Sequence, residues 1–438
     1  MCVLVSTSIS SCVSLGREPG ANAAKSAQAV TPAPPKVETL PQSLSLAEAR
    51  RIAYQHNWDL LAAQANVEQA IALEEVSREF PNPTFSYTTG RISVDSTSSA
   101  TRLGNKFWDR SYDSIFAVNQ LFEIGGKRTL RQSLATHGRQ AAQASLQDAR
   151  RILDLGVTRA YLAVLLAEAN VGILYDSAES LRQEAEIAAT RLHAGDIAEA
   201  DKAQIEIAAD QLELNAEVAQ STAQTARIAV EVLLGVKKPS GSWRSADRLE
   251  SLAVDIFSGR TAVVQPRPDV LFAEESLRKS ESDLGLQQAI RIPDPTAIIQ
   301  YEHNPPDTTN TIGIGVSFPL PLWNSNKGNI KAAAAAQTIA AEQLGKVKTQ
   351  AASEVAAARV ALAEATARRQ RYAESIAPKS AETLKTVQYA YRKGGAALID
   401  LLQAQRTDNE IRVAVAQAMA DKAVATANQA SALNIRNP

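Results

Sequence analysis

Apolar positions along this chain follow two periods, which alternate in an order that occurs twice. Helical spacing gives way to strict alternation, which is typical of strands, and then returns for a much longer stretch. In the first half the expected elements are a helix over about 45–79, strands over 85–95 and 112–121, and helices over about 127–193 and 196–234. This order predicts a helix, a strand pair and a long antiparallel helical hairpin.

The second half repeats the order. Its expected elements are a helix from Arg267 to the Pro293-Asp294-Pro295 stop, strands over 296–302 and 311–318, and helices over about 327–392 and 396–430. In the last strand Ile312, Ile314, Val316 and Phe318 share one face, and Gly313, Gly315 and Ser317 share the other. A repeated unit of this length predicts two structurally equivalent halves.

The repeat divides the chain into four parts. Residues 44–235 form the first repeat, 236–262 an irregular connection, and 263–438 the second repeat. Residues 1–43, rich in Ser, Ala and Pro, are expected to be a signal-like segment followed by a flexible tether. The sequence ending at Cys12 resembles a bacterial lipobox, which makes Cys12 a candidate for lipidation. No Lys or Arg precedes Cys12, as a lipoprotein signal would require. The alternatives for this segment are a signal peptide whose start is misplaced, or a disordered chain end.

Short motifs mark where the expected helices begin and end. Ser45 and Glu48 form a capping box at the first helix. Gly195 is expected to end the first long helix, with Asp196 and Glu199 capping the next one. Gly125-Gly126-Lys127 resembles part of a phosphate-binding loop, but the first glycine of that pattern is missing, so a helix start is the expected role.

The two glycine turns of the long hairpins match each other. Gly195, Asp201 and Gln204 in the first correspond in spacing to Gly394, Asp400 and Gln403 in the second. Glycine lets a helix end in the left-handed conformation, so both hairpins are expected to reverse at these points.

Composition and charge exclude several classes of protein. The net charge is −1 with mixed signs, which gives no nucleic-acid footprint. Aromatic residues make up only 5% of the chain, which suits closely packed long helices. No uninterrupted run of 18 apolar residues occurs, so an ordinary membrane-spanning helix is not expected, whereas short alternating strands are compatible with a membrane β-barrel.

The chemistry of a catalytic or metal centre is not apparent. The four histidines are not paired at metal-ligand spacing, and both cysteines, Cys2 and Cys12, lie before the folded body. No nucleophile and base, or pair of acids, emerges from any stretch. We therefore expect no enzyme activity, no cofactor and no resident metal.

The order of these elements resembles that of the TolC family of outer-membrane efflux ducts, over nearly the whole chain after residue 43. The motifs that carry the resemblance are Arg267-Pro-Asp-Val270, Phe318-Pro-Leu-Pro-Leu-Trp323, and Tyr391 to Gly394 followed by Asp400 to Gln405. Glu123-Ile-Gly-Gly-Lys-Arg128 and Pro319 to Asn324 are most similar to the branch that serves heavy-metal cation exporters.

The resemblance implies a mainly α fold with membrane β structure. Three chains would form a homotrimer whose strands close a twelve-stranded β-barrel in outer-membrane lipid, continued by a long α-helical tunnel through the periplasm of a Gram-negative bacterium. Its expected partners are a periplasmic membrane-fusion adaptor and an inner-membrane cation pump of the resistance-nodulation-division type. The alternative, drawn from the helices alone, is a soluble periplasmic coiled-coil adaptor or scaffold.

The family also implies a gate at the hairpin turns, where carboxylates recur threefold and attract cations. The candidate gate and selectivity residues are Asp201, Tyr391, Arg392, Lys393, Asp400 and Gln403, and the candidate turn residues are Gly195, Gly394 and Gly395. The family pattern has a second carboxylate where this chain has Gln403 and an arginine where it has Ala396. The alternative for each aspartate is a solvated or helix-capping carboxylate with no role in a gate. The alternative for residues 391–393 is that they are ordinary surface residues near a helix end.

Overall fold

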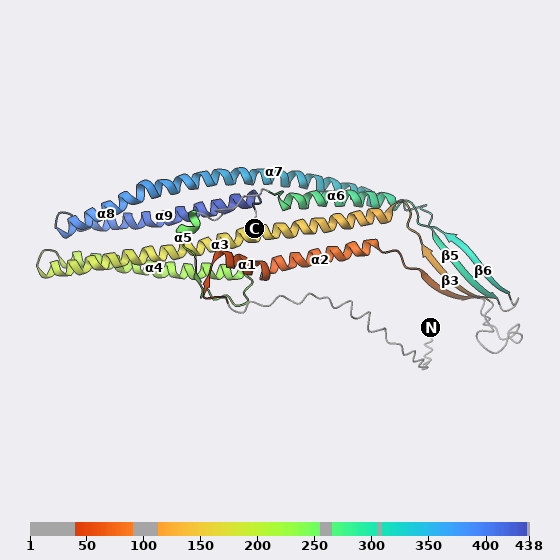
Figure 1. The fold of residues 1–438 in the computed structure, drawn as a ribbon, viewed down its shortest axis with the longest axis horizontal. Helices are drawn as coiled ribbons and strands as arrows, with labels where there is room; N and C mark the ends of the chain where they lie inside the picture. Colours follow the sequence, from red (N-terminus) through yellow and green to blue (C-terminus); the bar gives the residue numbers. More distant parts are fainter. Residues whose placement is uncertain (1–39, 91–112, 255–264, 305–308, 436–438) are drawn as a thin grey trace, which may run out of the picture.

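The computed structural model describes residues 40–90, 113–254, 265–304 and 309–435. The molecule is a long rod in which the helices run side by side and the strands project from one end (Figure 1). Cys12, nearly all of the proposed tether, and the loop expected before residue 110 lie outside the described residues, as do residues 91–95 of the first expected strand.

The first repeat contains four helices: α1 Leu46–His56, α2 Trp58–Arg78, α3 Lys127–His193 and α4 Glu199–Leu233. Ser45 caps α1 as expected, its hydroxyl accepting a hydrogen bond from the Glu48 amide. The single helix expected over 45–79 is wrong, because Asn57 interrupts it. The Asn57 side chain accepts from the Leu60 amide at 3.0 Å, which caps α2, and donates to the Leu233 carbonyl at 3.0 Å.

The second repeat contains α6 Pro268–Ala289, α7 Lys327–Arg371, α8 Ala377–Arg392 and α9 Leu398–Ala432. A single helix over 327–392 was expected, but α7 and α8 are joined by the π-helical turn η4, Tyr372–Ile376. Pro378 follows this turn and has no N–H for the carbonyl four residues earlier, so the regular hydrogen-bond pattern cannot continue through it. The order of elements otherwise repeats that of the first half, as predicted.

The connection between the repeats is tied to the start of the chain. The short strands β1, Ser43–Leu44, and β4, Arg244–Ser245, pair in parallel, and the helix α5, Leu249–Val254, follows. Beside them Trp243 stacks on Tyr161 of α3 with a centroid separation of 6.1 Å, and the Tyr161 hydroxyl donates to the Leu44 carbonyl at 2.8 Å. The connection is therefore anchored to the middle of α3 by a buried core.

Four strands form one antiparallel sheet at the end of the rod. They are β2 Thr84–Gly90, β3 Asp113–Leu121, β5 Thr296–Asn304 and β6 Thr309–Ser317, in the order β2-β3-β5-β6. The sheet joins the two repeats, because β3 of the first pairs with β5 of the second. Its outer strands, β2 and β6, each have one edge that pairs with no other described strand.

The sheet has one apolar and one small or polar face. Ile312 is opposite Tyr301 and Ile314 is opposite Ile299, which confirms the predicted alternation of β6. The same face carries Phe85, Tyr87, Phe116 and Val118 on the other two strands. On the reverse face a Cβ at Gly313 would lie 2.8 Å from Gln300 Cγ, so a larger residue there would require the Gln300 side chain to move.

The helix α3 contains a window that is long and apolar enough to cross a membrane by composition. The window is identified by its mean composition, since the sequence has no uninterrupted run of 18 apolar residues. Within the chain 39% of this window is buried. Among the apolar residues of α3, Val157, Leu162 and Val164 are fully buried in the chain's own core beside α1.

Candidate functional site

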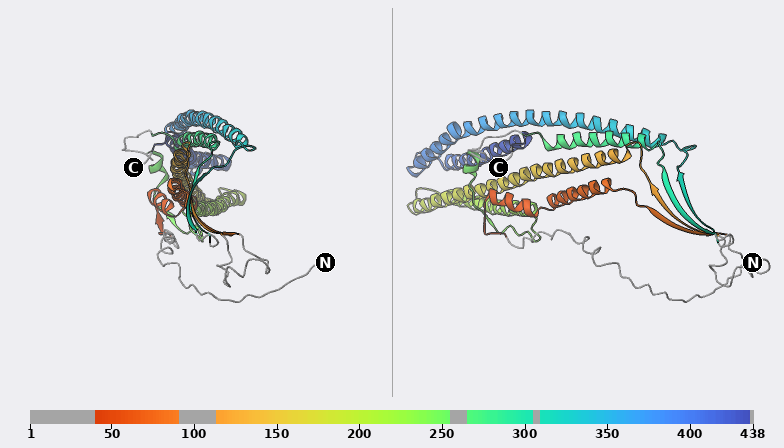
Figure 2. Two further views of the ribbon diagram at one scale, coloured as in Figure 1. Left: turned by 90° about the vertical axis from the view of Figure 1, so that its right-hand side faces the viewer. Right: turned by 45° about the vertical axis from the view of Figure 1, so that its right-hand side comes forward.

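Both long hairpins reverse at the end of the rod opposite the sheet (Figure 2). We call the two turns and the helix ends that flank them the hairpin tip, residues 181–212 and 387–405. Gly195 and Gly394 have φ angles of 78° and 74°, which side chains rarely adopt. The amides of Gly195 and Asp196 donate to the carbonyls of Leu192 and Arg191, both at 2.9 Å.

The second turn has the same hydrogen bonds. The amide of Gly394 donates to the Tyr391 carbonyl at 3.0 Å, and that of Gly395 to the Ala390 carbonyl at 2.8 Å. Each turn is a Schellman motif. The glycine that must be left-handed is Gly394, whereas Gly395 has no positive φ.

Asp400 and Asp201 occupy equivalent positions in the first turns of α9 and α4. The Asp400 side chain is exposed and its Oδ2 atom accepts a hydrogen bond from the Ala397 amide at 3.2 Å. Asp201 is half-buried. Both carboxylates therefore lie at the positive end of a helix dipole.

The expected cap of α4 is not formed. The helix begins at Glu199 with Ala198 in the capping position, and no side chain caps it. Asp196 is instead the last residue of the Schellman turn, where its amide is already bonded to the Arg191 carbonyl. The predicted capping residue, Asp196, therefore lies two residues before the observed capping position, Ala198.

Tyr391 is a core residue of the tip, with 3% of its surface exposed. Leu181, Ala185, Ile205 and Leu401 belong to the same buried cluster, which joins the two hairpins. Burial raises the pKa of its hydroxyl, and nearby Asp201 and Glu184 act in the same direction. The Arg191 guanidinium donates to the Tyr391 carbonyl at 3.0 Å and lies 5.2 Å from the centroid of its ring.

Arg392 binds Glu184, a residue that the sequence analysis did not identify. Its Nε atom lies 3.0 and 3.2 Å from the two carboxylate oxygens of Glu184, and Nη2 donates to one of them. The Glu184 side chain is 1% exposed. This hydrogen bond raises the pKa of Arg392. A glutamate in an apolar stripe of α3, three residues after Leu181 and four before Ala188, is the signal that could have indicated it.

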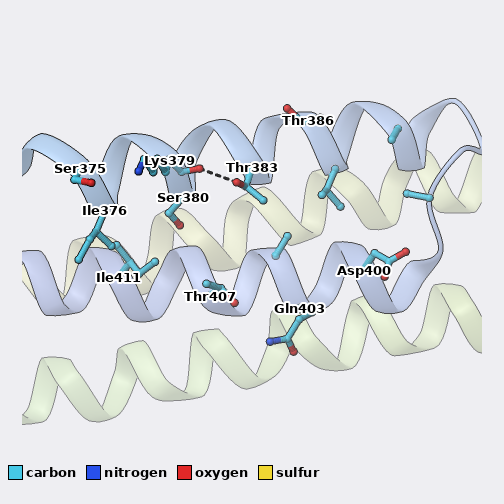
Figure 3. A pocket seen from close by; sticks show the side chains of 14 residues that line it. Ser375, Ile376, Lys379, Ser380, Thr383, Thr386, Asp400, Gln403, Thr407 and Ile411 are labelled. Atoms are coloured by element: carbon cyan, nitrogen blue, oxygen red, sulfur yellow. Dashed lines mark hydrogen bonds between the residues drawn. The ribbon is translucent and has the colours of Figure 1, made fainter. Parts of the chain in front are cut away.

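The remaining candidates lie on the surface. Lys393 contacts its own helix, with its ammonium 5.9 Å from the Tyr389 ring centroid. Gln403 is exposed and shares with Asp400 an open groove of about 720 Å³ between α8 and α9 (Figure 3). The lining is mainly apolar and includes five hydroxyl side chains: Ser375, Ser380, Thr383, Thr386 and Thr407. The groove runs from η4 to Asp400 at the tip.

In the part of the chain that the structure describes, no group of three or more His, Cys, Asp or Glu residues could hold a metal ion. The tip presents the exposed carboxylate of Asp400 and the exposed amide of Gln403, beside the basic side chains of Arg392 and Lys393.

The model of a family described as outer membrane efflux protein matches residues 49–236 and 261–434. The chain is 24% identical over 372 residues to the cobalt-zinc-cadmium resistance protein CzcC of Cupriavidus metallidurans, covering 84% of this chain and 85% of that protein.

Two solved structures have the same fold. The outer membrane protein VceC of Vibrio cholerae superimposes with a TM-score of 0.71 at 19% identity, over 89% of this chain and 96% of that one. CusC gives a TM-score of 0.71 at 15% identity, over 91% and 96% of the two chains. The rod of helices with a projecting sheet is thus an architecture shared with known outer-membrane proteins.

Proposed function

The chain belongs to the outer membrane efflux protein family, and we propose that three copies of it form the exit duct of a tripartite pump for heavy-metal cations. The protein is an outer-membrane efflux channel, a role that the matched family and its fold support. This membership decides against the alternative of a soluble periplasmic adaptor.

The sheet is the observation that carries the proposal. It has an apolar face, and its outer strands β2 and β6 have unpaired edges within the chain. In lipid an open edge would leave backbone amides and carbonyls without partners, so the sheet must close with other copies. Three chains of four strands give the twelve-stranded barrel that the sequence resemblance implied.

In this arrangement the helices continue the barrel as a tunnel through the periplasm. The sheet and the hairpin tip lie at opposite ends of the rod, so a chain whose strands are in the outer membrane points its tip toward the inner membrane (Figure 1). The tip is therefore the end that would meet a periplasmic adaptor and an inner-membrane pump of the resistance-nodulation-division type.

The proposed cargo comes from the similarity to CzcC, whose name records resistance to cobalt, zinc and cadmium. A duct needs no metal cage, and the tip presents carboxylates on an open surface. We propose that the pump and adaptor select the metal and that this chain conducts it without catalysis.

The tip would act as the gate. Three copies of Asp400 at a narrow mouth would form a ring of like charges, with Asp201, Gln403 and Lys393 nearby. The Arg392–Glu184 and Arg191–Tyr391 contacts join the two hairpins of one chain. Moving the hairpins apart would leave the Glu184 carboxylate buried without a partner, which opposes opening.

Deletion of the gene, alone and with the neighbouring pump genes, tests the cargo. The expected result is increased toxicity of cobalt, zinc or cadmium salts in both strains, restored by the intact gene. Unchanged tolerance of all three metals, together with sensitivity to organic compounds, would show that the cargo is not a metal cation.

A further inference from the structure

Lys127 holds the two repeats together where the helices meet the sheet. It is the first residue of α3, its side chain is 7% exposed, and its ammonium lies 2.8 Å from Asp294 Oδ1. The same ammonium donates to the Ile292 carbonyl. Asp294 is the middle residue of Pro293-Asp294-Pro295, directly before β5. The contact therefore spans the junction at which β3 pairs with β5.

The second repeat carries the same lysine without its partner. Lys327 is the first residue of α7, and it follows a left-handed residue, Asn326 with φ of 59°, as Lys127 follows Gly126 with φ of 74°. Lys327 is exposed. Nowhere in the described ranges does its ammonium have a hydrogen-bond or ion-pair partner.

The first repeat has a residue, Asn82, at the position that corresponds to Asp294, and its side chain also has no partner within the described residues. Asn82 is the middle residue of Pro81-Asn82-Pro83, directly before β2, and its side chain is exposed. Within the described residues the Asn82 side chain makes no hydrogen bond. Phe80 precedes this motif as Ile292 precedes the other.

The strand order places these two unpartnered residues at the two free ends of one sheet. Lys327 follows β6 and Asn82 precedes β2, and β6 and β2 are the outer strands. If copies close the sheet by pairing β6 with β2, that junction repeats the one between β3 and β5. The lysine of one copy then meets the Pro-Asn-Pro motif of the next.

Exposed apolar residues at the end of α2 support the same contact. Leu73 and Val76 on α2 are 58% and 56% exposed. Phe80, two residues after the helix, is 70% exposed, with the Arg128 guanidinium 3.8 Å from the centroid of its ring. The helix α6 packs against both α3 and α7, with Gly285 of α6 facing Leu130 of α3. The helix α2 packs against α3 but has no counterpart of the second long helix within the described residues, and the start of α7 from a second copy would supply it.

We infer that Lys327 of one copy binds the Phe80 carbonyl and the Asn82 side chain of a second copy, reproducing between chains the contact that Lys127 makes within one. This inference rests on the proposed trimer and adds the residues that set its register. The contact between chains is weaker than the one within the chain, because Asn82 is neutral where Asp294 is charged.

Cross-linking tests the pair in the full-length protein purified in detergent. In a background with Cys2 and Cys12 changed to serine, Asn82→Cys with Lys327→Cys should give covalent dimers and trimers with a short bismaleimide. Each single cysteine variant should give none. Trimers that persist under native conditions but yield no covalent product in the double variant would overturn the pair. A wild-type chain that is not trimeric at all would instead contradict the proposed function.

A charge series provides a second readout. Asn82→Asp completes the copy of the Lys127–Asp294 pair and should raise the temperature at which the trimer dissociates. Lys327→Glu should lower it, and Asn82→Lys in the same chain should restore at least half of the loss. If Asn82→Asp leaves the dissociation temperature unchanged or lowers it, and Asn82→Lys restores nothing, Lys327 does not contact Asn82.

Discussion

The Arg392 guanidinium on α8 forms a forked contact with the Glu184 carboxylate on α3, with Nε at 3.0 and 3.2 Å from its two oxygens. Glu184 is 1% exposed, whereas Arg392 is 46% exposed. The cost of losing this pair therefore falls mainly on the buried acid. The contact joins the two hairpins of the tip.

Arg392→Ala should destabilise the protein and loosen the tip. Leaving a buried acceptor without its charged donor costs about 1.5–3 kcal/mol, and the thermal midpoint should fall accordingly. In planar bilayers the closed channel should conduct more often. Arg392→Lys keeps the positive charge but cannot form the forked contact with Glu184. Its thermal midpoint and conductance should lie between those of the wild type and of Arg392→Ala. Identical stability and conductance of all three proteins would remove this pair from the gate.

Asp400 has two separable roles, which two substitutions distinguish. Its Oδ2 atom caps the Ala397 amide, and its charge would contribute to the ring at the mouth. Asp400→Asn retains an oxygen acceptor, so it should lower cation selectivity with little change in stability. Asp400→Ala should lower selectivity and also cost about 0.5–1 kcal/mol of stability.

Reversal potentials in a salt gradient and thermal unfolding measure the two effects. If both Asp400 variants conduct cations and anions in the wild-type ratio, Asp400 is only a helix cap.

Gly394 and Gly395 form a matched pair for testing the turn. Gly394 has a φ of 74°, and a side chain in that conformation costs about 1–2 kcal/mol. Gly394→Ala should lower the free energy of unfolding by that amount. At Gly395 a Cβ would lie 3.6 Å from the nearest atom, the Ala390 carbonyl oxygen, and φ is not positive, so Gly395→Ala should be nearly neutral. Equal losses in the two variants would show that backbone conformation is not the reason for the glycine.

Periodicity over long stretches predicted the fold well. The helix expected over 127–193 is α3 with the same bounds, since tens of residues contribute to one signal. The break at Asn57 and the π-helical turn before Pro378 were not predicted from the sequence. In both cases one residue overrides the periodicity: Asn57 by bonding to the distant Leu233 carbonyl, and Pro378 by lacking an amide hydrogen.

The tip was predicted less completely than the fold. The glycine turns follow from local sequence, because a left-handed helix end is a local requirement. Glu184 lies far from Arg392 in sequence, and no local pattern pairs them. The capping of α4 by Asp196 and Glu199 was wrong because the Schellman turn extends to Asp196 and delays the start of the helix.

Alkaline pH should weaken the middle of the rod through Tyr54 on α1. Partial desolvation, together with the charge of Asp154 and a hydrogen bond to it, raises the pKa of Tyr54 from 10.0 to about 12, with 40% of the residue's surface still exposed. The folded state thus favours the neutral phenol, so its stabilising effect is complete below pH 10 and is lost as the pH rises to about 12.

Tyr54→Phe has no such group, so its stability should fall less than that of the wild type over this pH range. Urea unfolding of both proteins between pH 8 and 12 measures the difference between their free energies of unfolding. Groups that titrate equally in both proteins do not contribute to this difference. A constant difference across the whole range would contradict the raised pKa.

The central claim is that several copies of this chain close one sheet into a conducting pore. The most direct measurement combines the mass of the detergent-extracted protein with its conductance after insertion into a planar bilayer. The account predicts a trimer that requires detergent and produces discrete, cation-selective channels. A monomer that remains soluble without detergent and leaves the bilayer silent would contradict it.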